Sequence, residues 1–356
     1  MSINLTAIMK KMLEIDSPDL HLRVGHAPVL RLKNGELNTI QAEVMTKGDI
    51  YQVIDEITTP EQISAFREKH QIDFSYHIAG LSRFRVNVFD EYNGPGIAFR
   101  IIPEHIPTLE EIGLTQDIKD LLMESTGLVL VTGSTGMGKS TTLASMIDYI
   151  NENKKSHIIT VEDPIEFVYK NKKCLITQRE LNAHTRSFSE AISGALRQDP
   201  DVVMVGEMRD LETIAAAITL AETGHLVLST LHTTDAAQTV DRIIDVFPPY
   251  QQQQIRSQLS SVLKGVISQV LIPRADGDGR VAAREVMFVN DAIRNCIAKE
   301  ETHQIYSVIQ ISRDSGMNLM DDSLEDLCRD GVITEEAAVS HATDPDFFRG
   351  KLKAEI

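Results

Sequence analysis

Residues 127–140 read GLVLVTGSTGMGKS, and this segment is the strongest indication of the fold of the larger part of the chain. Its first half is an apolar run typical of a buried strand, and its second half matches the pattern G-x-x-x-x-G-K-S/T. A helix is expected next, because Leu143, Met146, Ile147 and Ile150 recur at helical spacing. Strand, glycine-rich loop and helix in this order predict a P-loop that binds the phosphates of a nucleotide.

The residue types in this loop suit phosphate chemistry. Glycines let the backbone approach phosphate oxygens closely, and the N–H groups at the start of the following helix bind negative charge. Lys139 is expected to neutralise the outer phosphates, and the hydroxyl of Ser140 is expected to bind Mg²⁺. ATP and Mg²⁺ are therefore the expected cofactors. The alternative, a glycine-rich turn without a ligand, leaves the spacing and its flanking elements unexplained.

Hydrolysis of the terminal phosphate also needs carboxylates near the metal and the attacking water. Glu162 and Asp163 follow the apolar run HIITV, and Glu207 follows DVVMVG. Ligands of α/β proteins bind at the C-terminal ends of strands, where these acids are expected to lie. We expect the strand before Glu207 to lie beside the P-loop strand. The alternative is that each acid caps a helix or lies in a solvated loop.

Two histidines, His225 and His232, bracket the apolar run LVLSTL. A histidine at a strand end can sense the γ-phosphate or a neighbouring subunit, although a lone histidine is more often structural. Both are candidates for the nucleotide site.

From Gly127 onward, apolar strand candidates alternate with helical stretches, which indicates a largely parallel sheet flanked by helices. The strand candidates are LVLVT, HIITV, DVVMV and HLVLSTL. After about residue 250 the pattern becomes helical, and one helix face is expected to carry Ile255, Leu259, Val262, Leu263, Val266, Ile267 and Val270. The predicted fold class is α/β with a helical C-terminal region.

Residues 1–102 are predicted to form a separate small α/β domain, with a helix, a strand pair, a second helix and further strands. Asn34-Gly35 between apolar runs predicts a hairpin turn. In SRFRVNVF at 82–89, apolar side chains alternate with Arg83 and Arg85, so the two arginines are expected on one face of a strand.

A linker is predicted between the two domains. Pro103 and Pro107 interrupt helix and strand alike, so residues 103–115 are assigned to the linker and residues 116–356 to the larger domain.

Composition limits the classes of function. With 35 basic and 52 acidic side chains the net charge is −17, which repels a polyphosphate backbone, so nucleic acid is not an expected partner. No apolar run approaches the roughly 20 residues that cross a bilayer, and the first residues lack the segments of a signal peptide. A cytoplasmic location is therefore expected. Three distant cysteines without a C-x-x-C pair argue against a zinc site or a disulfide framework.

Four segments together resemble one family. GSTGMGKSTT, VEDPIEF, ALRQDPDVVMVGEMRDLETI and AETGHLVLSTLHTTDA follow one another as in the secretion ATPases of type II secretion and type IV pili. Within that superfamily the chain resembles the pilus retraction ATPases over nearly its whole length, through the further segments SPDLHLRVG, SRFRVNVF and VAAREVMFVNDAIRNCI.

The resemblance implies a PAS-like N-terminal domain, a RecA-like P-loop ATPase domain and a hexameric ring. Such a ring hydrolyses ATP to power pilus retraction and twitching motility. The resemblance further implies peripheral contact with a platform protein of the pilus machinery at the inner membrane. A paralogous ATPase is an additional candidate partner.

Carried over residue by residue, the resemblance assigns roles to particular positions. Nucleotide binding falls to Walker A, which comprises Gly133, Ser134, Thr135, Gly136, Met137, Gly138, Lys139, Ser140 and Thr141, and to a histidine box of His225 and His232. Metal binding falls to Ser140, to Glu162 and Asp163 of the aspartate box, and to Glu207 of Walker B. Catalysis falls to Glu207, Glu162 and Lys139, together with Arg83, Arg85 and Arg100, which this family brings near the nucleotide from the N-terminal domain.

Two segments depart from the family pattern. The family carries a C-terminal motif close to A-I-R-N-L-I-R-E, which is needed for retraction rather than for hydrolysis. In this chain the corresponding residues 292–299 read AIRNCIAK. Walker A has Ser134 and Met137 where proline and serine are usual, and neither side chain needs to touch phosphate.

Three alternative functions stay open at this point. The first is an ATPase of pilus assembly or type II secretion, although these usually carry longer N-terminal domains and a four-cysteine zinc insertion. The second is a nucleic-acid translocase. The third is a regulator that uses nucleotide only to hold a ring together.

Overall fold

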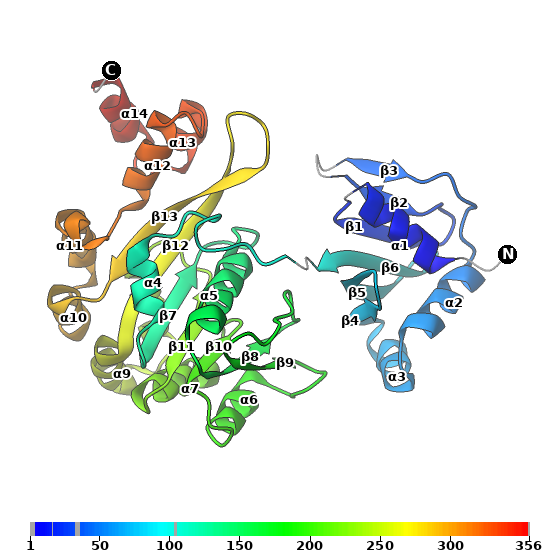
Figure 1. The fold of residues 1–356 in the computed structure, drawn as a ribbon, viewed down its shortest axis with the longest axis horizontal. Helices are drawn as coiled ribbons and strands as arrows, with labels where there is room; N and C mark the ends of the chain where they lie inside the picture. The colour runs from blue at the N-terminus through cyan, green and yellow to red at the C-terminus, as the bar shows by residue number, and fades with distance from the viewer. Residues whose placement is uncertain (1–3, 16, 33–35, 103–104, 355–356) are drawn as a thin grey trace. The chain divides into compact units, whose positions relative to one another are not determined.

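The computed structural model describes residues 4–15, 17–32, 36–102 and 105–354. The chain divides into two compact units, residues 1–105 with 164–168 and residues 106–163 with 169–356 (Figure 1). Residues 106–115, which the prolines assign to the linker, thus belong to the second unit, where Leu109 and Leu114 are buried. Each unit contains one sheet.

The described part of the first unit is a six-stranded antiparallel sheet with three helices, in the strand order β3-β2-β1-β6-β5-β4. Its helices begin where the sequence supplies caps. The side chain of Thr46 caps α2, and that of Thr59, followed by Pro60, caps α3. The elements are α1 (Leu5–Glu14), β1 (Asp19–Arg23), β2 (Val29–Arg31), β3 (Leu37–Thr39), α2 (Lys47–Ile57), α3 (Pro60–Lys69), β4 (Gln71–Ile78), β5 (Ser82–Glu91) and β6 (Gly94–Ile102).

Strand β5 confirms the alternation predicted for its segment. Phe84, Val86 and Val88 are fully buried, whereas Arg83 and Arg85 on the opposite face are partly exposed. Burying such apolar side chains contributes about 1.5–3 kcal/mol each, so this face holds the core of the unit. The predicted turn at Asn34-Gly35 lies outside the described residues.

The second unit carries the P-loop and the rest of the chain. Its elements are α4 (Gln116–Leu122), β7 (Gly127–Thr132), α5 (Lys139–Asn153), β8 (His157–Glu162), β9 (Leu175–Glu180), α6 (Phe188–Ala195), β10 (Val202–Val205), α7 (Leu211–Glu222), β11 (Leu226–Leu231), α8 (Ala236–Asp245), α9 (Pro249–Val262), β12 (Leu263–Pro273), β13 (Arg280–Phe288), α10 (Asp291–Ala298), α11 (Ile305–Ile311), α12 (Met320–Arg329), α13 (Glu335–His341) and α14 (Pro345–Ala354).

The sheet of the second unit runs in the order β13-β12-β7-β11-β10-β8-β9, with every neighbouring pair parallel except β12 and β13 (Figure 1). The predicted parallel sheet is therefore confirmed. The prediction that the strand before Glu207 lies beside the P-loop strand is wrong, because β11 lies between β10 and β7. Both faces of these strands are buried, so their apolar runs contain no information about lateral order.

The helix expected to extend through Val270 is also corrected. Helix α9 ends at Val262, and the next residues form β12, which pairs with β7 on one side and β13 on the other. A strand buried on both faces is a continuous apolar run, and periodicity alone does not separate it from a buried helix. The helix predicted from about residue 250 is therefore present as α9, and helices resume at α10 after β12 and β13.

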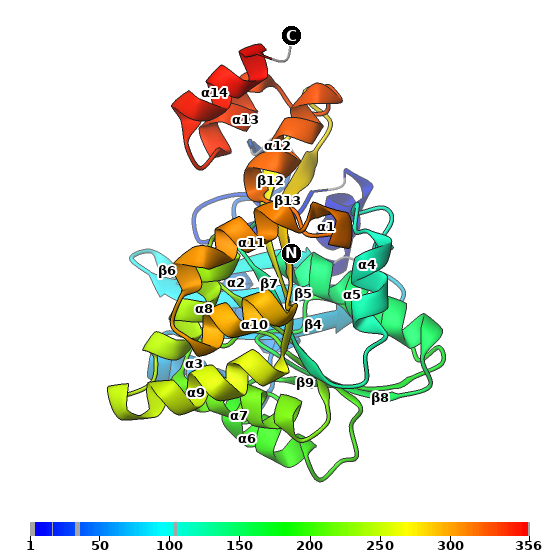
Figure 2. The same ribbon diagram turned by 90° about the vertical axis from the view of Figure 1, so that its left-hand side faces the viewer.

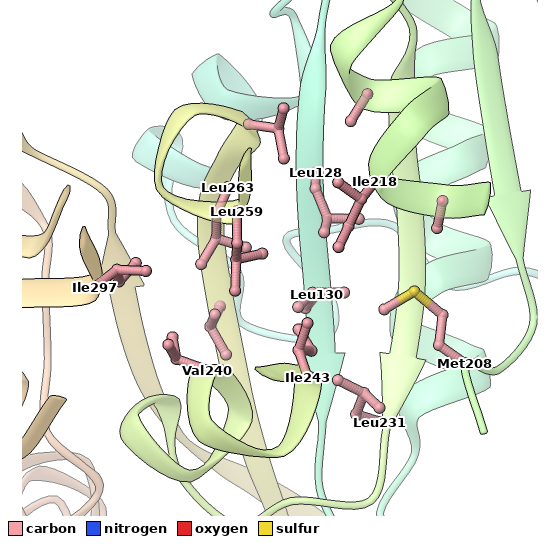
Figure 3. Packing of buried hydrophobic residues seen from close by; sticks show 14 of the residues in the cluster. Leu128, Leu130, Met208, Ile218, Leu231, Val240, Ile243, Leu259, Leu263 and Ile297 are labelled. Atoms are coloured by element: carbon pink, nitrogen blue, oxygen red, sulfur yellow. The ribbon is translucent and has the colours of Figure 1, made fainter. Parts of the chain in front are cut away.

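One large apolar core lies on the face of the sheet that α7, α8 and α9 cover (Figure 3). Leu128 and Leu130 of β7 belong to this core together with Ile218 of α7 and Leu259 of α9, and Leu128 lies beside Ile218. The residue between the two leucines, Val129, points to the other face, against which α5 packs. The P-loop therefore emerges from a strand fixed on both faces.

The C-terminal helices α12, α13 and α14 lie together around the distal part of β12 and β13 (Figures 1 and 2). Ile272 of β12, Leu324 of α12 and Phe348 of α14 are buried in their small core.

None of the helices in the described ranges combines the length and apolar character needed to span a bilayer. Cys174, Cys296 and Cys328 are free cysteines.

Candidate nucleotide-binding site

The P-loop joins the last residue of β7, Thr132, to the first residue of α5, Lys139. Gly133, Gly136 and Gly138 all have positive φ, at 139°, 80° and 80°. L-residues with a side chain rarely adopt these angles, so the glycines are required by the path of the loop. Gly133 also has no room for a side chain, since a Cβ there would lie 2.4 Å from the backbone oxygen of Gln269.

Lys139 is buried and reaches across the loop. Its Nζ donates hydrogen bonds to the carbonyl oxygens of Gly133 at 2.6 Å and Ser134 at 3.0 Å. The same atom lies 3.4 Å from Nδ1 of His232. The ammonium group is thus held inside the loop by neutral acceptors, and phosphate oxygens would bind it more strongly because they are charged. Ser140 beside it is exposed.

Glu207 lies just beyond the end of β10 and contacts two cationic or ionisable side chains. Its Oε1 lies 2.7 Å from Nε of Arg209 and 2.9 Å from Nε2 of His232, within ion-pair distance of both. The hydrogen bond to Glu207 raises the pKa of Arg209. Because Lys139 can only donate, Nδ1 of His232 is the acceptor and Nε2 carries the proton given to Glu207. His232 therefore joins the P-loop lysine to Glu207.

Glu162 is the last residue of β8, next to β10, and is buried. Its Oε1 accepts hydrogen bonds from the hydroxyl of Thr160 at 2.6 Å and the side-chain amide of Gln178 at 3.1 Å. The following residue, Asp163, is exposed. The backbone N–H of Gly206 donates to the carbonyl of Val161 at 2.8 Å, which ties the segment before Glu207 to the segment of Glu162.

The site follows one edge of the sheet, with one chemical group from each of four neighbouring strands. Lys139 follows β7, His232 follows β11, Glu207 follows β10, and Glu162 ends β8. Parallel strands lie about 4.8 Å apart, so the four adjacent C-terminal ends form one continuous row along this edge. Residues scattered over the sequence thus converge at the edge where α/β proteins bind ligands.

His225 does not join this row. It precedes β11, and the pairing of Leu226 with Gly127 and of Leu231 with Thr132 places it at the opposite edge of the sheet from the P-loop. At about 3.3 Å per strand residue it lies roughly 20 Å from His232. Its Nδ1 contacts the carbonyl of Leu220 at 3.0 Å. A role of His225 at the nucleotide or at a neighbouring subunit stays a prediction. A strand has two ends, and only its C-terminal end meets the P-loop of the same chain.

The three candidate arginines share the partly exposed face of the first unit's sheet. Arg85 of β5 pairs across the strands with Arg100 of β6, and Arg83 lies two residues before Arg85. Arg100 forms a bidentate ion pair with Asp19, through Nε at 2.7 Å and a second nitrogen at 3.2 Å. The Nε of Arg83 is buried without a hydrogen-bond partner among the described residues. Their role at a nucleotide stays a prediction.

Comparison with known proteins identifies the family. The family model described as type II/IV secretion system protein matches residues 4–278. The chain belongs to this family. It is 48% identical over 330 residues to the type IV pilus retraction ATPase PilT of Pseudomonas aeruginosa, covering 93% of this chain and 95% of that protein. It is also 48% identical over 319 residues to a twitching motility protein of Neisseria gonorrhoeae, covering 90% of this chain and 85% of that protein.

A solved structure gives the same result for the fold. The pilus retraction motor PilT with bound ADP superposes with a TM-score of 0.91 and 42% identity, covering 97% of this chain and 99% of that chain. Together these likenesses confirm the predicted family and the fold class, an N-terminal domain followed by a RecA-like P-loop ATPase domain and a helical C-terminal region.

Sequence reasoning missed the strand that braces the P-loop of this family member. From β12, the side-chain amide of Gln269 donates to the carbonyl of Met137 at 2.5 Å, and the N–H of Leu271 lies 3.3 Å from Sδ of Met137. The available signal was a lone polar pair, Ser268 and Gln269, inside an apolar run. That pair is explained only once β12 is placed beside β7.

A second missed residue is Glu285 on β13. Its Oε1 accepts the backbone N–H of Ala236, the first residue of α8, at 2.8 Å. Burial raises the pKa of Glu285 to about 7. Backbone hydrogen bonds from Ala236 and Met320 act in the opposite direction and lower this pKa, but burial has the larger effect. Glu285 is thus a buried carboxyl group at the start of the helix that follows the His232 segment.

The titration of Glu285 predicts a specific pH dependence of stability. The folded chain holds this proton up to about pH 7, whereas an unfolded glutamate releases it near 4.5, so the folded state binds more protons in between. The free energy of unfolding therefore falls as the pH rises through this window, by up to about 3 kcal/mol from this group. Glu285→Gln keeps the acceptor oxygen and should remove this component. Urea unfolding from pH 5 to pH 8 measures the difference, and parallel curves for both proteins would contradict it.

Proposed function

We propose that the chain is an ATP-hydrolysing motor that powers type IV pilus retraction as a hexameric ring. The observation that carries the proposal is the row of Lys139, His232, Glu207 and Glu162 along the edge of a P-loop sheet. The relatives named as a retraction ATPase and a twitching motility protein support the biological role, and the ADP-bound neighbour supports nucleotide binding. Pilus assembly, type II secretion and nucleic-acid translocation are not favoured by these likenesses.

In the proposed reaction the chain positions phosphate, charge and water. Lys139 exchanges the carbonyls of Gly133 and Ser134 for phosphate oxygens, and the N–H groups at the start of α5 bind the same phosphates. Glu207 orients the attacking water and accepts its proton, while His232 holds the Glu207 carboxylate in place. Lys139 also contacts His232. A phosphate that binds Lys139 would therefore change the position of His232 and, through it, that of the Glu207 carboxylate.

The expected Mg²⁺ fits the residues present. The exposed hydroxyl of Ser140 and the carboxylates of Glu162, Asp163 and Glu207 are oxygen groups, which this hard cation prefers. When bound, Mg²⁺ neutralises charge on the β- and γ-phosphates.

Arginines from another subunit complete the proposed site. We assign this role to Arg83, Arg85 and Arg100, because charge on the transferring phosphoryl group is commonly stabilised by an arginine supplied in trans. Arg100 is already paired with Asp19. It can stabilise phosphate charge only if the phosphate binds beside Asp19 or takes the place of Asp19 as the partner of Arg100. Arg83 has no such competitor at its Nε among the described residues and is the first choice for mutation.

The altered C-terminal motif lies on α10. Of its departures, Cys296 is buried where the family has leucine, and Lys299 is exposed just after the helix. We propose that the exposed side of α10, which ends beside Lys299, contacts the pilus platform protein at the inner membrane. The motor itself would lie in the cytoplasm. The exposed Lys299 stands where the family has glutamate, which would alter the charge offered to that partner.

Twitching motility tests the proposed function. Cells lacking this gene should lose twitching, wild type should restore it, and Lys139→Ala should not, because the loop then lacks its phosphate-binding cation. In the purified protein Lys139→Ala should weaken ADP binding by about tenfold or more. Lys155→Ala, an exposed lysine just beyond the other end of α5, is the control. Normal twitching in the deletion strain would refute the retraction role.

A further inference from the structure

Gln269 is a polar residue in the middle of an apolar strand. It lies in β12, one residue beyond the pairing of Ser268 with Thr132, the last residue of the P-loop strand. Only 3% of its surface is exposed. Burying a side-chain amide costs free energy unless each of its polar groups has a hydrogen-bond partner. The partners of the Gln269 amide therefore indicate the role of this residue.

Both ends of the amide bind the P-loop and the helix that follows it. Nε2 donates to the carbonyl of Met137 at 2.5 Å, and Oε1 accepts the hydroxyl of Thr142, in the first turn of α5, at 2.9 Å. The orientation of the amide is determined by this network, because a carbonyl oxygen can only accept. One side chain therefore fastens the loop and the start of α5 to β12.

This contact sets the direction of a backbone N–H in the phosphate cradle. In a planar trans peptide the C=O of Met137 and the N–H of Gly138 point in opposite directions. Because Gln269 holds the C=O toward β12, the N–H is turned away from β12, to the side where a phosphate can approach. The backbone oxygen of Gln269 also fills the space beside Gly133, so the loop meets β12 at both of its ends.

We infer that Gln269 is a positioning residue for nucleotide phosphate, which holds the P-loop open in its anion-binding shape. The inference deepens the proposed function and rests on it, since it concerns the same site. Gln269 contacts no nucleotide itself and acts through Met137 and Thr142. Its loss should weaken phosphate binding in the ground state and the transition state alike.

Three variants test the two hydrogen bonds of the Gln269 amide. Gln269→Met removes both hydrogen bonds at nearly constant volume, and Gln269→Glu keeps an acceptor for Thr142 but cannot donate to Met137. Both should raise the KM for ATP and the Kd for a fluorescent ADP by roughly tenfold, with kcat changed less than about threefold. Thr142→Val breaks only the other half and should have a smaller effect.

A purely structural role predicts a different result. Gln269→Met would then lower the melting temperature without ligand, but the further rise on adding ADP, the KM and the Kd would match wild type. Gln252→Met is the matched control, because Gln252 in α9 also donates its amide to a backbone carbonyl, that of Phe247 at 3.0 Å. An unchanged KM and ADP shift in Gln269→Met would overturn the inference.

Failure of this inference is distinguishable from failure of the proposed function. ADP binding to full-length protein is measured without turnover, so the Gln269 variants are informative even if wild type hydrolyses no ATP. If wild type hydrolyses ATP and binds ADP while both Gln269 variants bind equally well, the function stands and the positioning role falls. If only the Gln269 variants lose ADP affinity and the Gln252 control does not, the positioning role stands.

Discussion

Replacing Glu207 with Gln is expected to lower the rate of ATP hydrolysis by roughly 10²- to 10⁴-fold while nucleotide binding persists. Glutamine keeps the size and an acceptor oxygen for Nε of Arg209 at 2.7 Å and Nε2 of His232 at 2.9 Å. It cannot accept a proton from water, because an amide is not a base in this pH range. The geometry of the site should therefore survive while the chemical step is lost.

Phosphate release at saturating ATP and titration with a fluorescent ATP analogue separate the two quantities. Glu212→Gln is the control, because it removes an exposed carboxylate from the first turn of α7 without touching the row at the sheet edge. If Glu207→Gln keeps turnover within about threefold of wild type, Glu207 is not the general base. Glu162, on the neighbouring strand, would then be the next candidate.

The parts of the fold that the sequence predicted are those determined by local pattern. The P-loop follows from a spacing of residues within one segment, and the alternation in β5 follows from side chains two residues apart. Glu207 and His232 were placed correctly at strand ends because each directly follows an apolar run. Their mutual contact depends on β10 and β11 being neighbours, which the sequence did not show.

The errors arise where distant segments decide the outcome. Strand β12 was taken for helix because both of its faces are buried, and the order of the parallel strands depends on crossovers rather than on composition. The same cause hid Gln269, whose role appears only when β12 lies against the P-loop. His225 was grouped with His232 because the two flank one strand, although the length of that strand separates them.

Gly133→Ala is expected to damage the P-loop more than any other single methyl group added to it. At φ of 139° an alanine is strained, and its Cβ would lie 2.4 Å from the backbone oxygen of Gln269, which cannot move without shifting β12. We expect the free energy of unfolding to fall by about 2–4 kcal/mol and ADP affinity to fall by roughly 100-fold. Gly133 is therefore required by packing as well as by conformation.

Gly136→Ala separates these two causes. Gly136 also has a positive φ, at 80°, but a Cβ there meets no atom within 4 Å. Alanine at this position should cost only the conformational strain, about 1–2 kcal/mol, because it does not press on β12. Urea unfolding and ADP titration of the two variants measure the difference. Equal losses would show that the contact with β12 adds nothing to the strain, whereas the larger loss expected at Gly133 combines backbone strain with crowding against β12.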